Sequence, residues 1–253
     1  QYCRAHGIPI LPPDVNQSVW KYSVGRDSQG VPGIRFGLGG VKNVGQGAVE
    51  LIVKERQHGP FTDIFDFASR ACGESLNKRT VESLIKAGAL DGMGHNRAEL
   101  LSVYEQLMDD AAQKKRQNLT GQLSLFDLAA PGGGTPQPPF RIPSLPEHPR
   151  KVLLSMEKEM TGVYITGHPL DEVRDLLGSG FTTVAEVLED ADSESKGQEY
   201  DGLSVSMAGI LTQCRGKVTK KGSMMGFLVL EDLTGSIEGL VFPKVYEKYA
   251  SML

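Results

Sequence analysis

The stretch Gly39-Gly40-Val41-Lys42-Asn43-Val44-Gly45-Gln46-Gly47-Ala48 decides how the first half of this chain folds. Glycine permits tight turns with φ > 0 and close approach of the backbone to another molecule. We expect Gly45 to provide one of these two features. Apolar residues within 49–56 recur at helical spacing and predict an amphipathic helix. A turn leading into a helix amino end presents free N–H groups and the positive end of the helix dipole, which suits a phosphate. A purely structural turn between two helices is the alternative.

The sequence before this stretch predicts short extended segments. Residues 7–16 contain three prolines and should be extended after a glycine stop. Residues 21–24 and 34–38 predict two short strands around the polar turn 26–30. We expect Trp20 to pack beside them.

Two short helices are predicted after it. Thr62 or Asp63 should cap a helix within residues 61–68, and Asn77 should cap a second one that ends at Gly88.

Lys78 and Arg79 fall in the first turn of the second helix, where cations oppose the helix dipole. An anionic partner would offset this, although a solvated face is the commoner explanation. A long helix is then predicted over residues 96–116, where apolar residues recur at steps of three and four.

Apolar residues without a nearby core follow the long helix, in Gln122-Leu123-Ser124-Leu125-Phe126. Burial by another protein explains them best, and packing back on the long helix is the alternative. Residues 129–149 are rich in proline and glycine and predict an extended, mobile linker.

The last third of the chain changes from helix to strand. Residues 150–160 and 181–188 predict helices. Strands are predicted from 203 to 219, 224 to 231 and 237 to 242, and a helix begins at Pro243. This series matches the first part of an OB barrel, which needs five strands to close.

Composition limits the class of protein. The 253 residues are 40% hydrophobic and 23% charged, as in a packed globular protein, and a net charge of −4 argues against a uniformly basic nucleic-acid-binding surface.

Cys3, Cys72 and Cys214 form no CxxC pair, so we expect neither a disulfide framework nor a zinc ribbon, and a reducing cytoplasm fits best. No signal peptide and no long apolar run is present, so we expect no export and no membrane span. The start at Gln1, without an initiator Met, suggests a segment of a larger protein.

The order of these motifs resembles the C-terminal half of the family C replicative DNA polymerases, the alpha subunits of bacterial DNA polymerase III. Residues 7–16 resemble the end of the fingers region, 36–45 and 76–91 a tandem helix-hairpin-helix domain, and 166–170 the connection towards an OB domain. The resemblance implies a multidomain α+β protein in which a helix-hairpin-helix domain is followed by a linker and a truncated OB-fold barrel. The implied domains are the end of the fingers (1–36), the tandem hairpin domain (37–118), a clamp-binding motif (119–128), the linker (129–149), a helical connector (150–200) and the first part of the OB domain (201–253).

In this family the hairpin grips duplex DNA, which implies a DNA-binding set of Val41, Lys42, Asn43, Val44, Gly45, Gln46, Gly47, Lys78 and Arg79. The chain departs from the usual Gly-hydrophobic-Gly hairpin, because Asn43-Val44-Gly45 replaces it. Asn is the residue other than Gly that best tolerates the left-handed region, so the turn should survive. The second hairpin unit lacks such a loop, which leaves open whether it contacts DNA or is mainly structural.

The resemblance assigns the apolar segment to binding of the beta sliding clamp through Gln122, Leu123, Ser124, Leu125 and Phe126. Burial of Leu125 and Phe126 would each contribute about 1.5–3 kcal/mol. The OB region would meet single-stranded DNA, with charge from Lys217, Lys220 and Lys221. Phe227 is a candidate for base stacking and equally a candidate for the barrel core.

The implied enzyme is a DNA-directed DNA polymerase, a nucleotidyltransferase that uses magnesium. In the family the metal-binding carboxylates lie upstream, so we expect no catalytic residue, metal or cofactor in this segment and no activity from it alone. The clamp-loader subunit tau and a proofreading exonuclease are further implied partners. Two alternatives remain: a stand-alone repair or recombination module with hairpin and OB domains, and a scaffold in which only the clamp motif acts.

Overall fold

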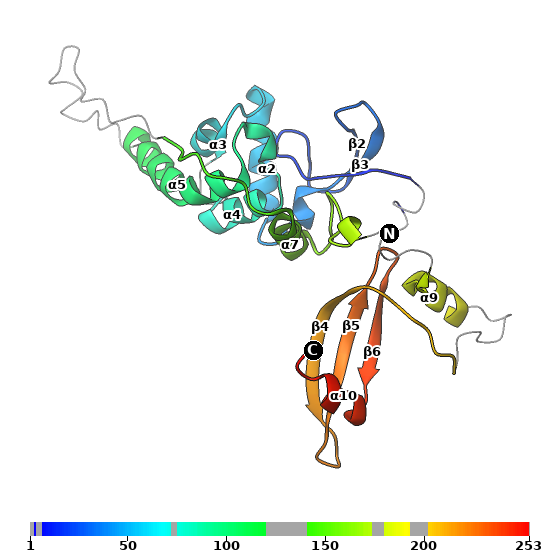
Figure 1. Ribbon diagram of the computed structural model, residues 1–253. Helices are drawn as coiled ribbons and strands as arrows, with labels where there is room; N and C mark the ends of the chain where they lie inside the picture. Colours follow the sequence, from blue (N-terminus) through cyan, green and yellow to red (C-terminus); the bar gives the residue numbers. More distant parts are fainter. Residues whose placement is uncertain are drawn as a thin grey trace, which may run out of the picture. The chain divides into compact units, whose positions relative to one another are not determined.

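The computed structural model describes residue 3 and residues 7–71, 75–119, 141–173, 180–192 and 202–252 (Figure 1). The chain forms two compact units: a helical unit, His6–Gly167, and a sheet unit, which combines His168–Leu253 with Gln1–Ala5. Among the described residues, no helix combines the length and apolar character needed to cross a membrane.

A small sheet opens the helical unit. Its strands are β1 (Ile10–Leu11), β2 (Ser23–Arg26) and β3 (Pro32–Arg35), in the order β1-β3-β2. The predicted strand pair is confirmed as an antiparallel hairpin of β2 and β3, displaced by about two residues in each strand. The parallel strand β1 lies where the sequence predicted only extended chain.

The helices of this unit follow the apolar periodicity of the sequence. Their bounds are η1 (Leu38–Gly40), α2 (Gln46–Glu55), η2 (Arg56–His58), α3 (Ile64–Ala71), α4 (Lys78–Lys86), η3 (Asp91–Met93), α5 (Arg97–Leu119) and α7 (Arg150–Thr161).

Two predicted caps are confirmed. The Asp63 carboxylate accepts hydrogen bonds from the N–H groups of Phe65 and Asp66, and Asn77 Oδ1 accepts from the Thr80 N–H. Gly88 ends α4 as predicted, with φ of 81°, because its N–H and that of Ala89 turn back to carbonyls of the last helical turn.

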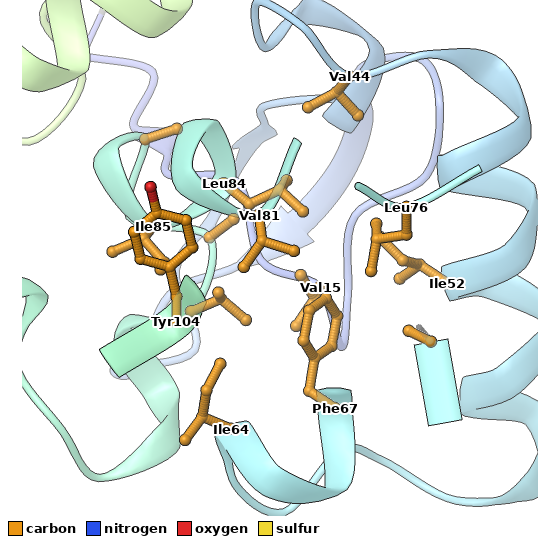
Figure 2. Packing of buried hydrophobic residues seen from close by; sticks show 14 of the residues in the cluster. Val15, Val44, Ile52, Ile64, Phe67, Leu76, Val81, Leu84, Ile85 and Tyr104 are labelled. Carbon is orange, nitrogen blue, oxygen red and sulfur yellow. The ribbon is translucent and has the colours of Figure 1, made fainter. Parts of the chain in front are cut away.

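One continuous core joins these elements (Figure 2). Ile52 of α2, Phe67 of α3 and Leu84 of α4 are fully buried in it. It extends from Val15, which precedes the predicted hairpin domain, to Ile165, which follows α7. The compact helical unit is therefore larger than the predicted domain at 37–118, because segments on both sides complete its core.

Residues 141–149 are held against the amino end of α5. The Glu147 carboxylate accepts hydrogen bonds from the N–H groups of Arg97 and Ala98, and Asn96 Nδ2 donates to the Leu145 carbonyl. The prediction of a mobile linker over 129–149 is thus wrong around Leu145 and Glu147, because the Glu147 carboxylate satisfies free N–H groups of a helix. Residues 120–140 lie outside the described part.

A buried ion pair fixes α7 to the same unit. Arg97 Nη2 lies 3.1 Å from Glu157 Oε1, and the side chains are only 4% and 1% exposed. Asp91 makes a second ion pair with Arg97 at 2.7 Å, and Glu157 also accepts hydrogen bonds from Thr166. Because every charge has a partner, burial is tolerated.

The sheet unit contains an antiparallel meander in the order β4-β5-β6. Its elements are η4 (Asp171–Val173), α9 (Val184–Asp192), β4 (Ile210–Val218), β5 (Met224–Glu231), β6 (Ser236–Val241) and α10 (Pro243–Tyr249). The three strands and the following helix confirm the expected series, except that the first strand begins at Ile210 rather than 203. The fold class is therefore a helical hairpin region followed by a sheet region consistent with part of an OB-like domain.

Candidate functional site

The predicted hairpin loop runs from η1 to α2 and separates buried from exposed residues. Val41 and Val44 are 3% and 7% exposed and point into the core. Lys42, Asn43 and Gly45 lie at the surface. The two valines therefore anchor the loop, and only the exposed residues present side chains or open backbone to a ligand.

Asn43 supplies the left-handed turn of this loop. Its φ is 63°, which makes it the one residue other than glycine with positive φ within the described part of the chain. This conformation costs of order 1 kcal/mol for most side chains and least for Asn. The prediction that Asn43 lets the turn survive is consistent with this geometry.

Gly45 fits only one of the two roles expected of it. Its φ of −85° and ψ of 162° are extended and open to any residue, so the expectation of positive φ at Gly45 is wrong. A Cβ at this position would meet nothing within 4 Å. Gly45 therefore leaves open space over the amino end of α2, which keeps the expectation of close approach in place.

The amino end of α2 carries free donors. Gly45 is its N-cap residue without a side-chain cap, and no acidic residue lies in the first turn. The carbonyl of Gly45 accepts from Ala48 and Val49, whereas no described residue accepts from the N–H groups of Gln46 or Gly47. These donors and the helix dipole form an arrangement that attracts an anion.

The second hairpin helix, α4, packs beside the loop. The Thr80 hydroxyl donates to the Asn43 carbonyl at 3.0 Å, and Asn43 Nδ2 donates to Ser83 Oγ at 3.0 Å. Asn43 is held on both its main chain and its side chain. Sequence periodicity placed Thr80 and Ser83 on α4 but carried no signal for this contact.

A pocket of about 140 Å³ lies between the loop, α4 and α7. Its lining includes three cations and two carboxylates: Lys42, Arg79, Lys86, Glu82 and Glu159. Lys86 is paired with Glu82 at 2.6 Å, which leaves Lys42 and Arg79 as the cations of this pocket without an ion pair among the described residues.

The three predicted cations of the hairpin site do not stay together. Lys42 and Arg79 line one pocket, whereas Lys78 lies outside it. Lys78 Nζ instead forms an ion pair with Asp109 Oδ2 of α5 at 2.8 Å. Arg79 is exposed and better placed than Lys78 to meet an anion at the loop.

The sheet unit brings together part of the second predicted site. Phe227 is 40% exposed and pairs across the sheet with Arg215 and Leu240. Lys217 pairs with Met225, two residues from Phe227, and so lies on the same face. Lys220 and Lys221 are exposed in the turn after β4. Sequence reasoning missed Arg215, although its two-residue spacing from Lys217 would have placed both cations on one face.

The predicted clamp-binding residues, Gln122, Leu123, Ser124, Leu125 and Phe126, lie outside the described residues.

Comparison with known proteins finds one matching motif family and relatives that share a single name. A helix-hairpin-helix motif family matches residues 7–100. DNA polymerase III subunit alpha of Mycobacterium tuberculosis strain H37Rv is 39% identical over 253 residues, covering 98% of this chain and 20% of the relative. The proteins of the same name from Vibrio cholerae and Thermus aquaticus are 32% and 37% identical, covering 99% and 96% of this chain and 20% and 18% of the relatives.

The chain spans about a fifth of the length of these relatives. The resemblance inferred from its motifs is confirmed at the level of sequence similarity, and the hairpin region falls within residues 7–100. The chain is therefore homologous, over nearly its whole length, to a segment of bacterial DNA polymerase III alpha subunits.

Proposed function

We propose that the helical unit holds duplex DNA through its sugar–phosphate backbone, at the amino end of α2. The observation that carries this proposal is the open space at Gly45 over two N–H groups without a described acceptor. Lys42 and Arg79 flank the same loop and add positive charge. Backbone amides and cations fit a phosphate at a helix amino end, and phosphate contacts position a duplex without reading its sequence.

Salt dependence and sequence preference test this proposal together. We expect the 253-residue chain to bind two duplexes of unrelated sequence with Kd values within about twofold, and both affinities to fall as salt is raised. Binding that depends on sequence, or that salt leaves unchanged, would contradict a backbone grip.

For the sheet unit, we propose that the face with Phe227, Arg215 and Lys217 contacts single-stranded DNA. Support comes from the exposure of Phe227 beside a cationic cross-strand neighbour. Aromatic stacking and nearby positive charge are the usual means of binding single strands. Phe227→Leu should weaken binding of an oligothymidine strand and spare duplex binding; equal affinity for the strand would argue against stacking.

For the whole protein, we propose DNA-directed DNA synthesis in the cytoplasm, with residues 122–126 as a tether to the beta sliding clamp. The relatives carry the name of a DNA polymerase subunit, and a tether would raise the local concentration of DNA at the hairpin. Contacts with tau and a proofreading exonuclease would belong to the same assembly.

We also propose that this segment alone does not extend a primer. Among the described residues, no group of three or more His, Cys, Asp or Glu side chains lies together to hold a metal ion, and we assign the magnesium ions of synthesis to other parts of the whole subunit. Metal-dependent primer extension by the purified segment would disprove this.

A further inference from the structure

The loop between η1 and α2, on which the proposed function relies, is held by the neighbouring helix α4. Asn43 adopts φ of 63° in the first hairpin, where its contacts come from α4 of the second hairpin. Thr80 and Ser83 are 3% and 2% exposed. Two buried hydroxyls thus point at one exposed residue in a conformation that L side chains rarely adopt.

We propose that Ser83 and Thr80 are positioning residues for DNA binding: they hold Asn43 in the left-handed conformation and thereby aim the amino end of α2 at a phosphate. This inference rests on the proposed backbone grip at Gly45. In this role, the second hairpin neither contacts DNA directly nor serves only as packing; it positions the loop of the first hairpin.

The geometry explains how the hydroxyls act at a distance from the phosphate. The carbonyl and the N–H of a trans peptide point in opposite directions. Because Thr80 holds the Asn43 carbonyl on α4, the N–H of Val44 is directed away from it and donates to the Val41 carbonyl at 3.2 Å. This bond closes the turn that leads into Gly45.

Ser83 fixes the same residue through its side chain. Its oxygen accepts from Asn43 Nδ2, so the Asn43 side chain is directed towards α4. The Lys42 N–H donates to the Met160 carbonyl at 2.7 Å, which holds the preceding residue from the opposite helix, α7. The turn is therefore bonded on both sides, and loss of either hydroxyl should let Asn43 leave the left-handed region.

A rescue experiment separates positioning from packing. Ser83→Ala should weaken duplex binding by the 3- to 10-fold that about one hydrogen bond is worth. It should also speed amide exchange at Lys42 and Val44, whose N–H groups are hydrogen-bonded in the turn. Asn43→Gly adopts positive φ without the hydroxyl, so Ser83→Ala added to Asn43→Gly should leave affinity within about twofold of Asn43→Gly alone. Ser102→Ala, which removes an exposed hydroxyl on α5, is the matched control and should change neither reading.

The readings also separate this inference from the proposed function. The positioning role would be overturned if Ser83→Ala reduced duplex affinity equally in wild type and in Asn43→Gly. Unchanged amide exchange in Ser83→Ala would overturn it as well. Should the wild-type chain fail to bind duplex DNA, the proposed function falls, and amide exchange at the loop still decides whether Ser83 holds Asn43. Thr80→Val offers a second variant of equal size and should loosen the same loop.

Discussion

At the residue scale, Asn43 and Gly45 have separate roles in the hairpin loop. Asn43 provides the positive φ, and Gly45 provides space over free N–H groups. The sequence identified both residues and the conformational tolerance of Asn. It left open whether Gly45 also adopts positive φ, and it could not show that the hydroxyls of Thr80 and Ser83, about forty positions away, contact the turn.

Gly45→Val should weaken duplex binding by about tenfold or more while the fold survives. Backbone φ at this position suits any residue, and an added Cβ meets no neighbour, so the fold should tolerate valine. The valine side chain should instead block the approaching phosphate and so reduce duplex affinity. Gly88→Val is the contrasting variant: φ is +81° and the added Cβ would clash with Arg97 Nη2, so we expect marked loss of stability. Thermal unfolding and duplex titration of both variants check this; full duplex affinity in a folded Gly45→Val would contradict it.

Arg79→Gln should weaken duplex binding more than Lys78→Gln does. Arg79 is exposed beside Lys42, whereas Lys78 is engaged with Asp109 at 2.8 Å. A lost phosphate contact of this kind reduces affinity for all sequences alike. Titration at one low salt concentration measures the difference, and a larger loss in Lys78→Gln would reverse the assignment.

At the element scale, helix α5 shows what periodicity predicts and what it cannot. Its apolar spacing predicted a helix over residues 96–116, and the observed bounds are Arg97–Leu119. Asn96 caps this helix locally, because its Oδ1 accepts from the Glu99 N–H. The second cap was not predicted, because Glu147 reaches the free N–H groups of Arg97 and Ala98 from about fifty positions along the chain. The same contact explains why a Pro-rich segment that resembles a linker is ordered over residues 141–149.

The Glu147 cap should make the stability of the helical unit depend on pH. Burial alone would raise the pKa of Glu147, but hydrogen bonds from the N–H groups of Arg97, His148 and Ala98 outweigh it and lower this pKa. A carboxyl whose folded pKa is depressed contributes stability above its unfolded pKa, and this contribution is lost as pH falls below about 4.

Urea unfolding of wild type and Glu147→Gln at pH 7 and pH 3 measures that contribution. The gap between them should be about 0.5–2 kcal/mol at pH 7, as for other helix caps, and should shrink at pH 3. Glu50→Gln, at an exposed site on α2, is the control. A gap that stays constant with pH would show that the Glu147 charge is not what caps α5.

At the scale of the whole molecule, the sequence predicted the order of the parts better than their borders. Local patterns found the hairpin helices, the long helix and the three-stranded meander. The helical unit nevertheless runs from His6 to Gly167, because Val15 and Ile165 complete a core that local periodicity cannot reveal. The Arg97–Glu157 ion pair is another such long-range contact, which joins α5 to α7.

The clamp tether that we propose would be a property of the whole molecule, separate from the proposed DNA contact of the hairpin. Changing Leu125 and Phe126 together to Ala should abolish binding to the beta clamp, because about 1.5–3 kcal/mol of apolar burial is lost at each residue. Duplex binding by the same variant should stay within about twofold of wild type, since the proposed grip lies at α2. The measurement is the affinity of each variant for immobilised clamp, and unchanged clamp affinity would contradict the proposed tether.

The salt dependence of duplex affinity tests the backbone grip most directly. For wild type, log Kd should rise linearly with log salt concentration, and Lys42→Gln combined with Arg79→Gln should reduce that slope by about 2, one for each lost phosphate contact. A double variant with the wild-type slope, or a wild-type affinity that salt does not change, would contradict the claim that this hairpin loop holds the DNA backbone.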